Sequence, residues 1–240
     1  MFRNQINCAK RIFLDLFLCI LIKEGYSQNL DSLKEERFTA HIQVTAISQI
    51  KPAFRAGYTG QNSLSPQSET RFSVTSTLFL GAKLWDGASL YINPEFAGGS
   101  GLSTSFGVGA STNGEAYRID SPSPKVDLAK IFVKQYFSLS CKTDYFDSDL
   151  NRMGGKVPQK YISIIVGKIS VTDIFDSNSY SHDPRTQFMS WALMSNGALD
   201  FPANTRGYTP SLAIEYVTKG NELRYGISMV PTAPNGMKMN

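Results

Sequence analysis

Apolar and polar residues alternate along much of this chain with a period of two, which is the period of a half-buried β-strand. Between residues 70 and 84, Phe72, Leu78 and Leu80 share one parity, while arginine, serine and threonine occupy the other. Similar alternation occurs in the segments 38–50, 88–96, 126–139, 161–171, 212–216 and 223–229. The pattern predicts an all-β chain of roughly 8–10 strands. Helical periodicity is confined to two short stretches, residues 30–37 and 187–194.

The lengths of the strands and of their connections narrow the fold class. The candidate strands run for about 9–14 residues, whereas ordinary strands have about 5–6 and tilted membrane strands about 9–11. Tight turns are expected at 85–87 and 219–221, and long polar connections at 97–125 and 172–209. Short turns at one rim and long loops at the other are typical of an antiparallel transmembrane β-barrel of the outer-membrane type. A secreted, soluble β-sandwich that binds glycans is the alternative that this pattern leaves open.

The N-terminus has the pattern of a secretory signal. Three basic residues precede a run of eleven mostly apolar residues at 12–22, and small and polar residues follow. A run of eleven is too short to span a membrane, which takes about 20 residues. We therefore expect a signal peptide at 1–28, a short N-terminal segment at 29–37, and a barrel domain over 38–240.

Composition and charge exclude several classes of protein. The chain has 240 residues, 42% of them hydrophobic and 18% charged, with a formal net charge of +4. This weak and scattered charge does not favour a nucleic-acid partner. The mean hydropathy of −0.18 excludes a polytopic helical membrane protein but allows a β-barrel. One cysteine, Cys141, lies beyond the expected signal, so the exported chain has no internal disulfide.

Motifs for catalysis, metals and cofactors have little support in the sequence. The two histidines, His41 and His182, have no partners at metal-ligand spacing, and no Gly-x-Ser-x-Gly motif is present. We therefore expect neither a cofactor nor an enzyme. An enzyme that acts on glycans would have to use two loop carboxylates, with Asp183 and Asp200 as the candidates.

The connection at 172–209 carries the densest set of hydrogen-bonding and aromatic side chains. Loops of this length are usually functional or disordered, and the aromatic residues argue against disorder. Arginine, carboxylate and amide groups beside aromatic rings suit a neutral polyhydroxylated ligand, because fixed donors and acceptors replace the water around a sugar. Folded into a barrel, such a loop would form the constriction of the pore. Pairing of Arg185 and Arg206 with nearby aspartates, simply to fix the loop, is the alternative.

Several blocks of sequence occur in the order found in a known family. They are Leu78–Glu95 with its Trp85-Asp86-Gly87 turn, Asn113–Arg118, Gly167-Lys168 with Asp173–Asp176, His182–Phe188 with Trp191–Met194, and Asp200–Tyr208. Together these blocks resemble the carbohydrate-selective porin (OprB) family of Gram-negative outer membranes. The resemblance implies an outer-membrane β-barrel that admits small carbohydrates by facilitated diffusion, with outer-membrane lipid around it and no cofactor.

Candidate residues for the sugar path follow from the loop chemistry together with this resemblance. They are Asp183, Arg185, Trp191, Asp200, Arg206 and Tyr208, followed by Glu95, Glu115 and Arg118. Barrels of the family have about 16 strands or more, twice the number expected here. We therefore expect this chain to be the N-terminal part of such a barrel, roughly half of it. The sequence leaves a monomer and a homo-oligomer equally open.

Overall fold

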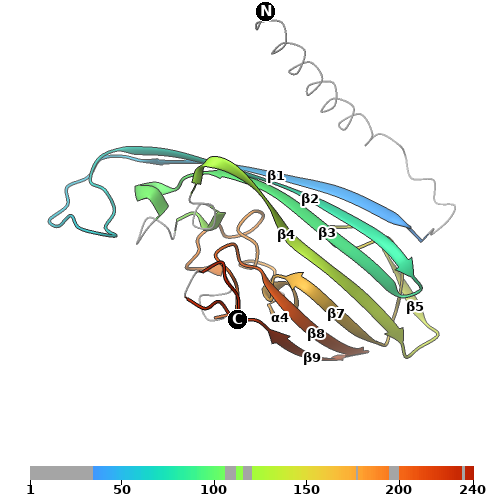
Figure 1. The fold of residues 1–240 in the computed structure, drawn as a ribbon. Helices are drawn as coiled ribbons and strands as arrows, with labels where there is room; N and C mark the ends of the chain where they lie inside the picture. Colours follow the sequence, from blue (N-terminus) through green and yellow to red (C-terminus); the bar gives the residue numbers. More distant parts are fainter. Residues whose placement is uncertain (1–34, 106–111, 116–120, 177, 195–199, 234–235) are drawn as a thin grey trace, which may run out of the picture. The chain divides into compact units, whose positions relative to one another are not determined.

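In a computed structural model, the described residues are 35–240 without 106–111, 116–120, 177, 195–199 and 234–235. The expected signal peptide at 1–28 lies outside them. The described residues form one antiparallel seven-stranded sheet, in the order β1-β2-β3-β4-β7-β8-β9, and a two-stranded sheet, β5-β6 (Figure 1). The large sheet consists of β1 (Phe38–Lys51), β2 (Glu69–Trp85), β3 (Ala88–Gly99), β4 (Ser121–Ser138), β7 (Tyr161–Ile169), β8 (Thr209–Thr218) and β9 (Asn221–Ser228). The remaining elements are β5 (Thr143–Phe146), β6 (Gly155–Pro158), the 3₁₀ helix η2 (Leu102–Ser105) and the short helix α4 (Thr172–Phe175).

The all-β prediction is confirmed, whereas the helical stretch considered at 187–194 is wrong. That stretch forms turns and irregular backbone. The Phe188 N–H gives the local reason, because it donates to the carbonyl of Tyr180 at 3.2 Å rather than to that of Pro184. An α-helix needs each N–H to bond to the carbonyl four residues before it. Within the described part of the chain, no helix is both long and apolar enough to cross a membrane.

Burial in the large sheet is the reverse of that in a soluble protein. On β2 the hydroxyl side chains of Thr75 and Thr77 are each only 2% exposed, whereas Phe72 on the opposite parity is 55% exposed. The same holds on β7, where Ser163 is fully buried and Val166 is 52% exposed. A soluble sandwich would bury its apolar face between two sheets. An apolar face toward the surroundings and a polar face toward the inside is the arrangement of a membrane barrel.

The strand register continues the exposed apolar face across the whole sheet. We call the two sides the apolar face and the polar face. On the apolar face, side chains of neighbouring strands stand opposite one another in the pairs Ile42–Leu78, Leu80–Ile92, Ile92–Ile131, Val133–Val166, Val166–Leu212 and Leu212–Ile227. Because a one-residue slip would turn every side chain to the other face, this register keeps the apolar band continuous from β1 to β9.

Both tight turns form where the sequence predicts them. β2 and β3 are joined through Asp86 and Gly87, and β8 and β9 through Lys219 and Gly220. Gly87 has φ +79° and Gly220 has φ +88°, values that glycine adopts without the steric cost of a Cβ atom. These turns lie at the same rim as the connection between β4 and β7, because successive strands are antiparallel.

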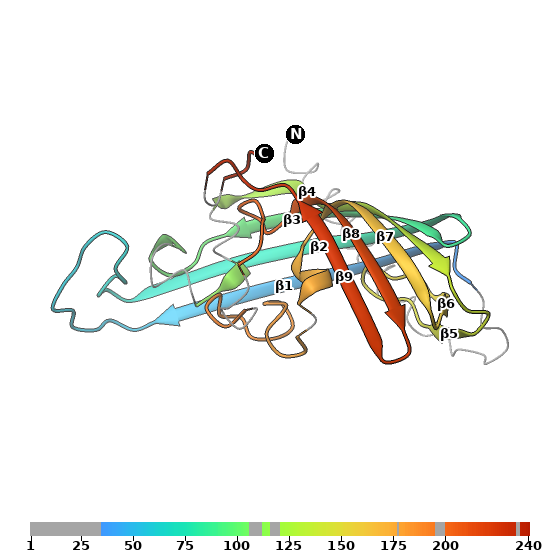
Figure 2. The same ribbon diagram turned by 90° about the horizontal axis from the view of Figure 1, so that it is seen from below.

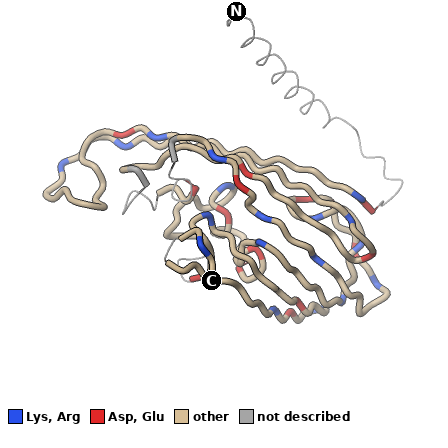
Figure 3. The backbone as a smooth tube through the Cα atoms, in the orientation of Figure 1, with Lys and Arg blue, Asp and Glu red and all other residues tan. Residues whose placement is uncertain are grey.

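Two segments cover the polar face of the curved sheet. One is the connection between β7 and β8, residues 170–208, which begins with α4; the other is the connection between β4 and β7, residues 139–160, which contains β5 and β6 (Figures 1 and 2). They pack around a small apolar cluster that includes Tyr91, Phe132 and Ile174, with Met153 against it. Acidic and basic residues are interspersed along the described chain (Figure 3).

Candidate functional site

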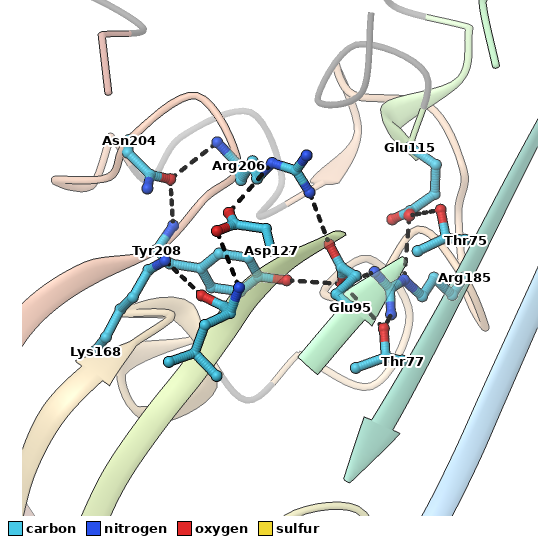
Figure 4. A network of polar contacts seen from close by, with 11 residues as sticks. Thr75, Thr77, Glu95, Glu115, Asp127, Lys168, Arg185, Asn204, Arg206 and Tyr208 are labelled. Atoms are coloured by element: carbon cyan, nitrogen blue, oxygen red, sulfur yellow. Dashed lines mark hydrogen bonds and ion pairs between the residues drawn. The ribbon is translucent and has the colours of Figure 1, made fainter. Parts of the chain in front are cut away.

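Arg185 is the centre of a polar network between the 170–208 segment and the sheet (Figure 4). Its guanidinium donates to Glu95 Oε2 at 2.7 Å and to Thr77 Oγ1 at 2.7 Å, and its Nε lies 3.1 Å from Glu115 Oε2. The Arg185 side chain is only 10% exposed, and those of the two glutamates are 6% and 4% exposed. The planar fork of an arginine satisfies several acceptors at once, which a lysine ammonium does with less geometric precision.

The strand period places the acceptors of Arg185 on one face. Thr75 and Thr77 are two residues apart on β2, so both side chains point to the polar face. Their hydroxyl groups donate to Glu115 and Glu95 at 3.0 and 2.9 Å. Thr77 stands opposite Glu95 of β3 in the register. Glu115 comes from the connection between β3 and β4, where Asn113 Oδ1 accepts the backbone N–H of Glu115 at 3.0 Å.

Arg206 makes a second connection from the 170–208 segment to the sheet. Its guanidinium lies 3.6 Å from Glu95 Oε1 and 3.4 Å from Asp127 Oδ2 on β4. The Tyr208 hydroxyl donates to Glu95 Oε2 at 3.3 Å. Asn204 shapes the backbone between them, since its Oδ1 accepts the N–H groups of both Arg206 and Tyr208. Glu95 is therefore shared by both arginines and the tyrosine.

The electrostatics of this network are closely balanced. Burial by itself would lower the pKa of Arg185, but the negative charges of Glu115 and Glu95 outweigh it and raise that pKa. Arg185 is thus a permanent cation. Two guanidinium groups face three carboxylates, and the Lys168 ammonium lies over the Tyr208 ring, 5.8 Å from its centroid. A ring of one charge sign selects ions in a pore, whereas a balanced set presents paired donors and acceptors to neutral solutes.

The structure brings together five of the nine residues that the sequence singled out, namely Glu95, Glu115, Arg185, Arg206 and Tyr208. Asp183 has a local role beside them, because its carboxylate accepts the Arg185 N–H and the Thr186 hydroxyl. Trp191 is half-buried and Asp200 is exposed; neither belongs to the residues drawn in Figure 4. Arg118 lies outside the described residues.

Sequence reasoning missed the five other labelled residues of the network: Thr75, Thr77, Asp127, Lys168 and Asn204. The two threonines had a usable signal, since both fall on the polar parity of β2. Asp127 had no such signal in the sequence, because its partner Arg206 lies 79 residues further along the chain. The arginines do pair with carboxylates, but those of Glu95, Glu115 and Asp127 rather than the aspartates of their own loop.

A cavity of about 370 Å³ adjoins this network on the polar face. Arg185, Asp183 and Tyr208 line one side of it, and strands β2, β3, β4 and β7 contribute its wall. Leu150 and Asn151, from the 139–160 segment, line it as well. No group of three or more His, Cys, Asp or Glu among the described residues is arranged to hold a metal ion.

The model of the carbohydrate-selective porin, OprB family, matches residues 61–234. This range covers most of the chain and contains β2 to β9 and the whole Arg185 network. The chain belongs to the carbohydrate-selective porin family. No curated protein and no solved structure matched it. Porins of this family are β-barrels of Gram-negative outer membranes with carbohydrates as substrates, and the all-β antiparallel sheet agrees with that architecture.

For a porin, the reversed burial has a direct interpretation. The polar face, which carries the Arg185 network, is the face toward the lumen, and the apolar face is the outer one. The 170–208 segment, which covers the polar face, then lies on the lumen side of the sheet.

Proposed function

We propose that this porin carries neutral carbohydrates across the outer membrane by facilitated diffusion, and that the 170–208 segment forms the constriction through which they pass. The observation that carries the proposal is the attachment of this segment to the polar face by Arg185. Three contacts of 2.7–3.1 Å hold the guanidinium of this loop residue against side chains of β2, β3 and the connection between β3 and β4. A constriction must keep its shape to discriminate between solutes, and these contacts hold the segment in place.

The proposed sugar path runs along the Arg185 network. Glu95, Glu115, Arg206 and Tyr208 supply acceptors, donors and an aromatic ring, and Asp183 lines the adjoining cavity. Trp191, Asp200 and Arg118 remain proposed contributors from the same loops. The balance of charge supports a neutral solute, since a sugar hydroxyl can donate to a carboxylate and accept from a guanidinium at neighbouring positions.

The proposed surroundings of the sheet are outer-membrane lipids. Ile42, Val166 and Ile227 are each more than half exposed on the apolar face. In water such a continuous band would be an aggregation surface, whereas hydrocarbon removes that cost. An N-terminal signal peptide at 1–28 would deliver the chain to this location.

Conductance in a planar lipid bilayer tests the proposal. The porin is added to the bilayer in its full-length form, with a closed barrel, the ionic current through it is measured, and glucose is then titrated. We expect a steady ionic conductance that decreases as glucose occupies the constriction. A conductance that does not respond to any neutral sugar would contradict a carbohydrate path, and recovery of the protein in solution without detergent would contradict the membrane location.

A further inference from the structure

The 139–160 segment is much longer than the other connections at the same rim of the sheet. The other two connections there are tight turns, but this segment contains the β5-β6 pair and folds over the polar face. Ser148 Oγ lies 2.6 Å from Thr39 Oγ1 and 2.8 Å from His41 Nε2, both on β1. The segment connects β4 to β7, but its tip is bonded to β1, the edge strand on the other side of the curved sheet.

Further contacts hold the middle of the segment. Gly154 and Glu36 exchange two hydrogen bonds of 2.9 and 3.0 Å, and the Met153 N–H donates to the Tyr91 hydroxyl at 3.3 Å. Gly81 on β2 clears the space for this packing, because a Cβ there would lie 2.6 Å from the Thr39 methyl group and 3.3 Å from Met153 Cγ. The 139–160 segment is thus a built part of the lumen wall.

The tip of this segment faces the constriction across the cavity. Leu150 and Asn151 line the cavity together with Arg185 and Asp183 of the 170–208 segment. The volume of about 370 Å³ lies near the lower end of the usual range for ligand sites, about 300–1,000 Å³. A cavity of this size between two inward-folded segments has room for one sugar ring.

The residue types in the cavity wall indicate what it binds. Arg185, Asp183 and Asn151 line it with a guanidinium, a carboxylate and an amide group. These groups match sugar hydroxyls, and the wall residues Phe79 and Phe132 provide apolar surface for the C–H face of a ring.

We propose that this cavity is a binding compartment for one neutral saccharide unit and that Leu150 and Asn151 form its second wall, so that selectivity is set by two segments in series. The inference rests on the proposed function, because it takes a sugar as the permeating solute. It goes further in assigning a specificity role to a segment of the short-turn rim.

Sugar block of the ionic current tests the role of the amide. Asn151 has φ +55°, which glycine adopts easily, so Asn151→Gly removes the amide and keeps the backbone. We expect the glucose concentration for half-maximal block to rise about fivefold, the equivalent of one neutral hydrogen bond. Gln159→Ala is the matched control, since Gln159 is an exposed amide of the same segment that bonds to Asp144. If the glucose concentration for half-maximal block is the same in Asn151→Gly, in Gln159→Ala and in the wild type, the compartment is overturned. The proposed function would still stand, because glucose still blocks the current.

Protection from chemical labelling locates the sugar independently of the current. Leu150→Cys is made with Cys8, Cys19 and Cys141 replaced by serine, and its reaction with a water-soluble maleimide is timed. We expect glucose to slow the labelling of Leu150→Cys. The labelling of a Gln159→Cys variant, made with the same three cysteine replacements, should not change. Unchanged labelling at position 150 would overturn the compartment. Absence of both block and protection in every form would overturn the proposed function as well.

Discussion

Among single residues, the buried charges around Arg185 matter most for the proposed constriction. Removing one partner of a buried ion pair leaves the other charge without compensation, which costs more than the pair itself contributes. Glu95 and Glu115 would both be left in this state, since their side chains are almost entirely covered. An exposed pair offers the contrast: the side chains of Arg152 and Asp149 are 46% and 61% exposed.

Arg185→Leu should therefore destabilise the folded porin by about 3–5 kcal/mol or release the 170–208 segment from the sheet. Arg152→Leu should change the free energy of unfolding by about 0–1 kcal/mol. Urea unfolding in lipid vesicles gives both values, and single-channel conductance detects a released segment as a larger current. Similar values for the two variants, with unchanged conductance, would show that the Arg185 contacts do not hold the constriction.

At the scale of elements, the turns and strand faces were predictable and the long-range partners were not. The parity of Thr75 and Thr77 follows from the period of two, and the glycine turns follow from local chemistry. The pairing of Arg185 with Glu95 joins residues 90 apart, and nothing local in either segment encodes it. The β5-β6 pair was missed because strands of four residues are too short to show alternation.

The two turn glycines give a matched prediction. Gly87→Ala and Gly220→Ala both place a Cβ on a backbone with positive φ, which costs about 1–2 kcal/mol. At Gly87 the new Cβ would also lie 2.5 Å from the Tyr136 carbonyl oxygen, whereas at Gly220 it meets nothing within 4 Å. We expect Gly87→Ala to lower the free energy of unfolding clearly more than Gly220→Ala. Equal losses would mean that the β2-β3 turn and β4 are less closely packed than described.

At the scale of the whole molecule, the continuous apolar face is the feature that separates a porin wall from a soluble sheet. Leu78 lies near the middle of β2 on that face, and its neighbour Thr77 points to the lumen. A charged side chain on the lipid face near the midplane of a barrel costs about 2–4 kcal/mol.

Leu78→Arg should accordingly reduce the stability of the lipid-embedded protein by about 2–4 kcal/mol, with a smaller loss for Phe38→Arg at the end of β1. Urea titration in vesicles measures both. The difference between the two losses is the test. If the apolar face were in contact with water, arginine would cost little stability at either position, and the two losses would be equal.

The most direct test of the central claim is the swelling rate of liposomes that contain this porin, compared for glucose and for gluconate, a charged sugar acid of similar size. We expect rapid swelling with glucose and slower swelling with gluconate, because the balanced charges around Arg185 favour neutral solutes. Equal rates for the two solutes, or no swelling with glucose, would contradict it.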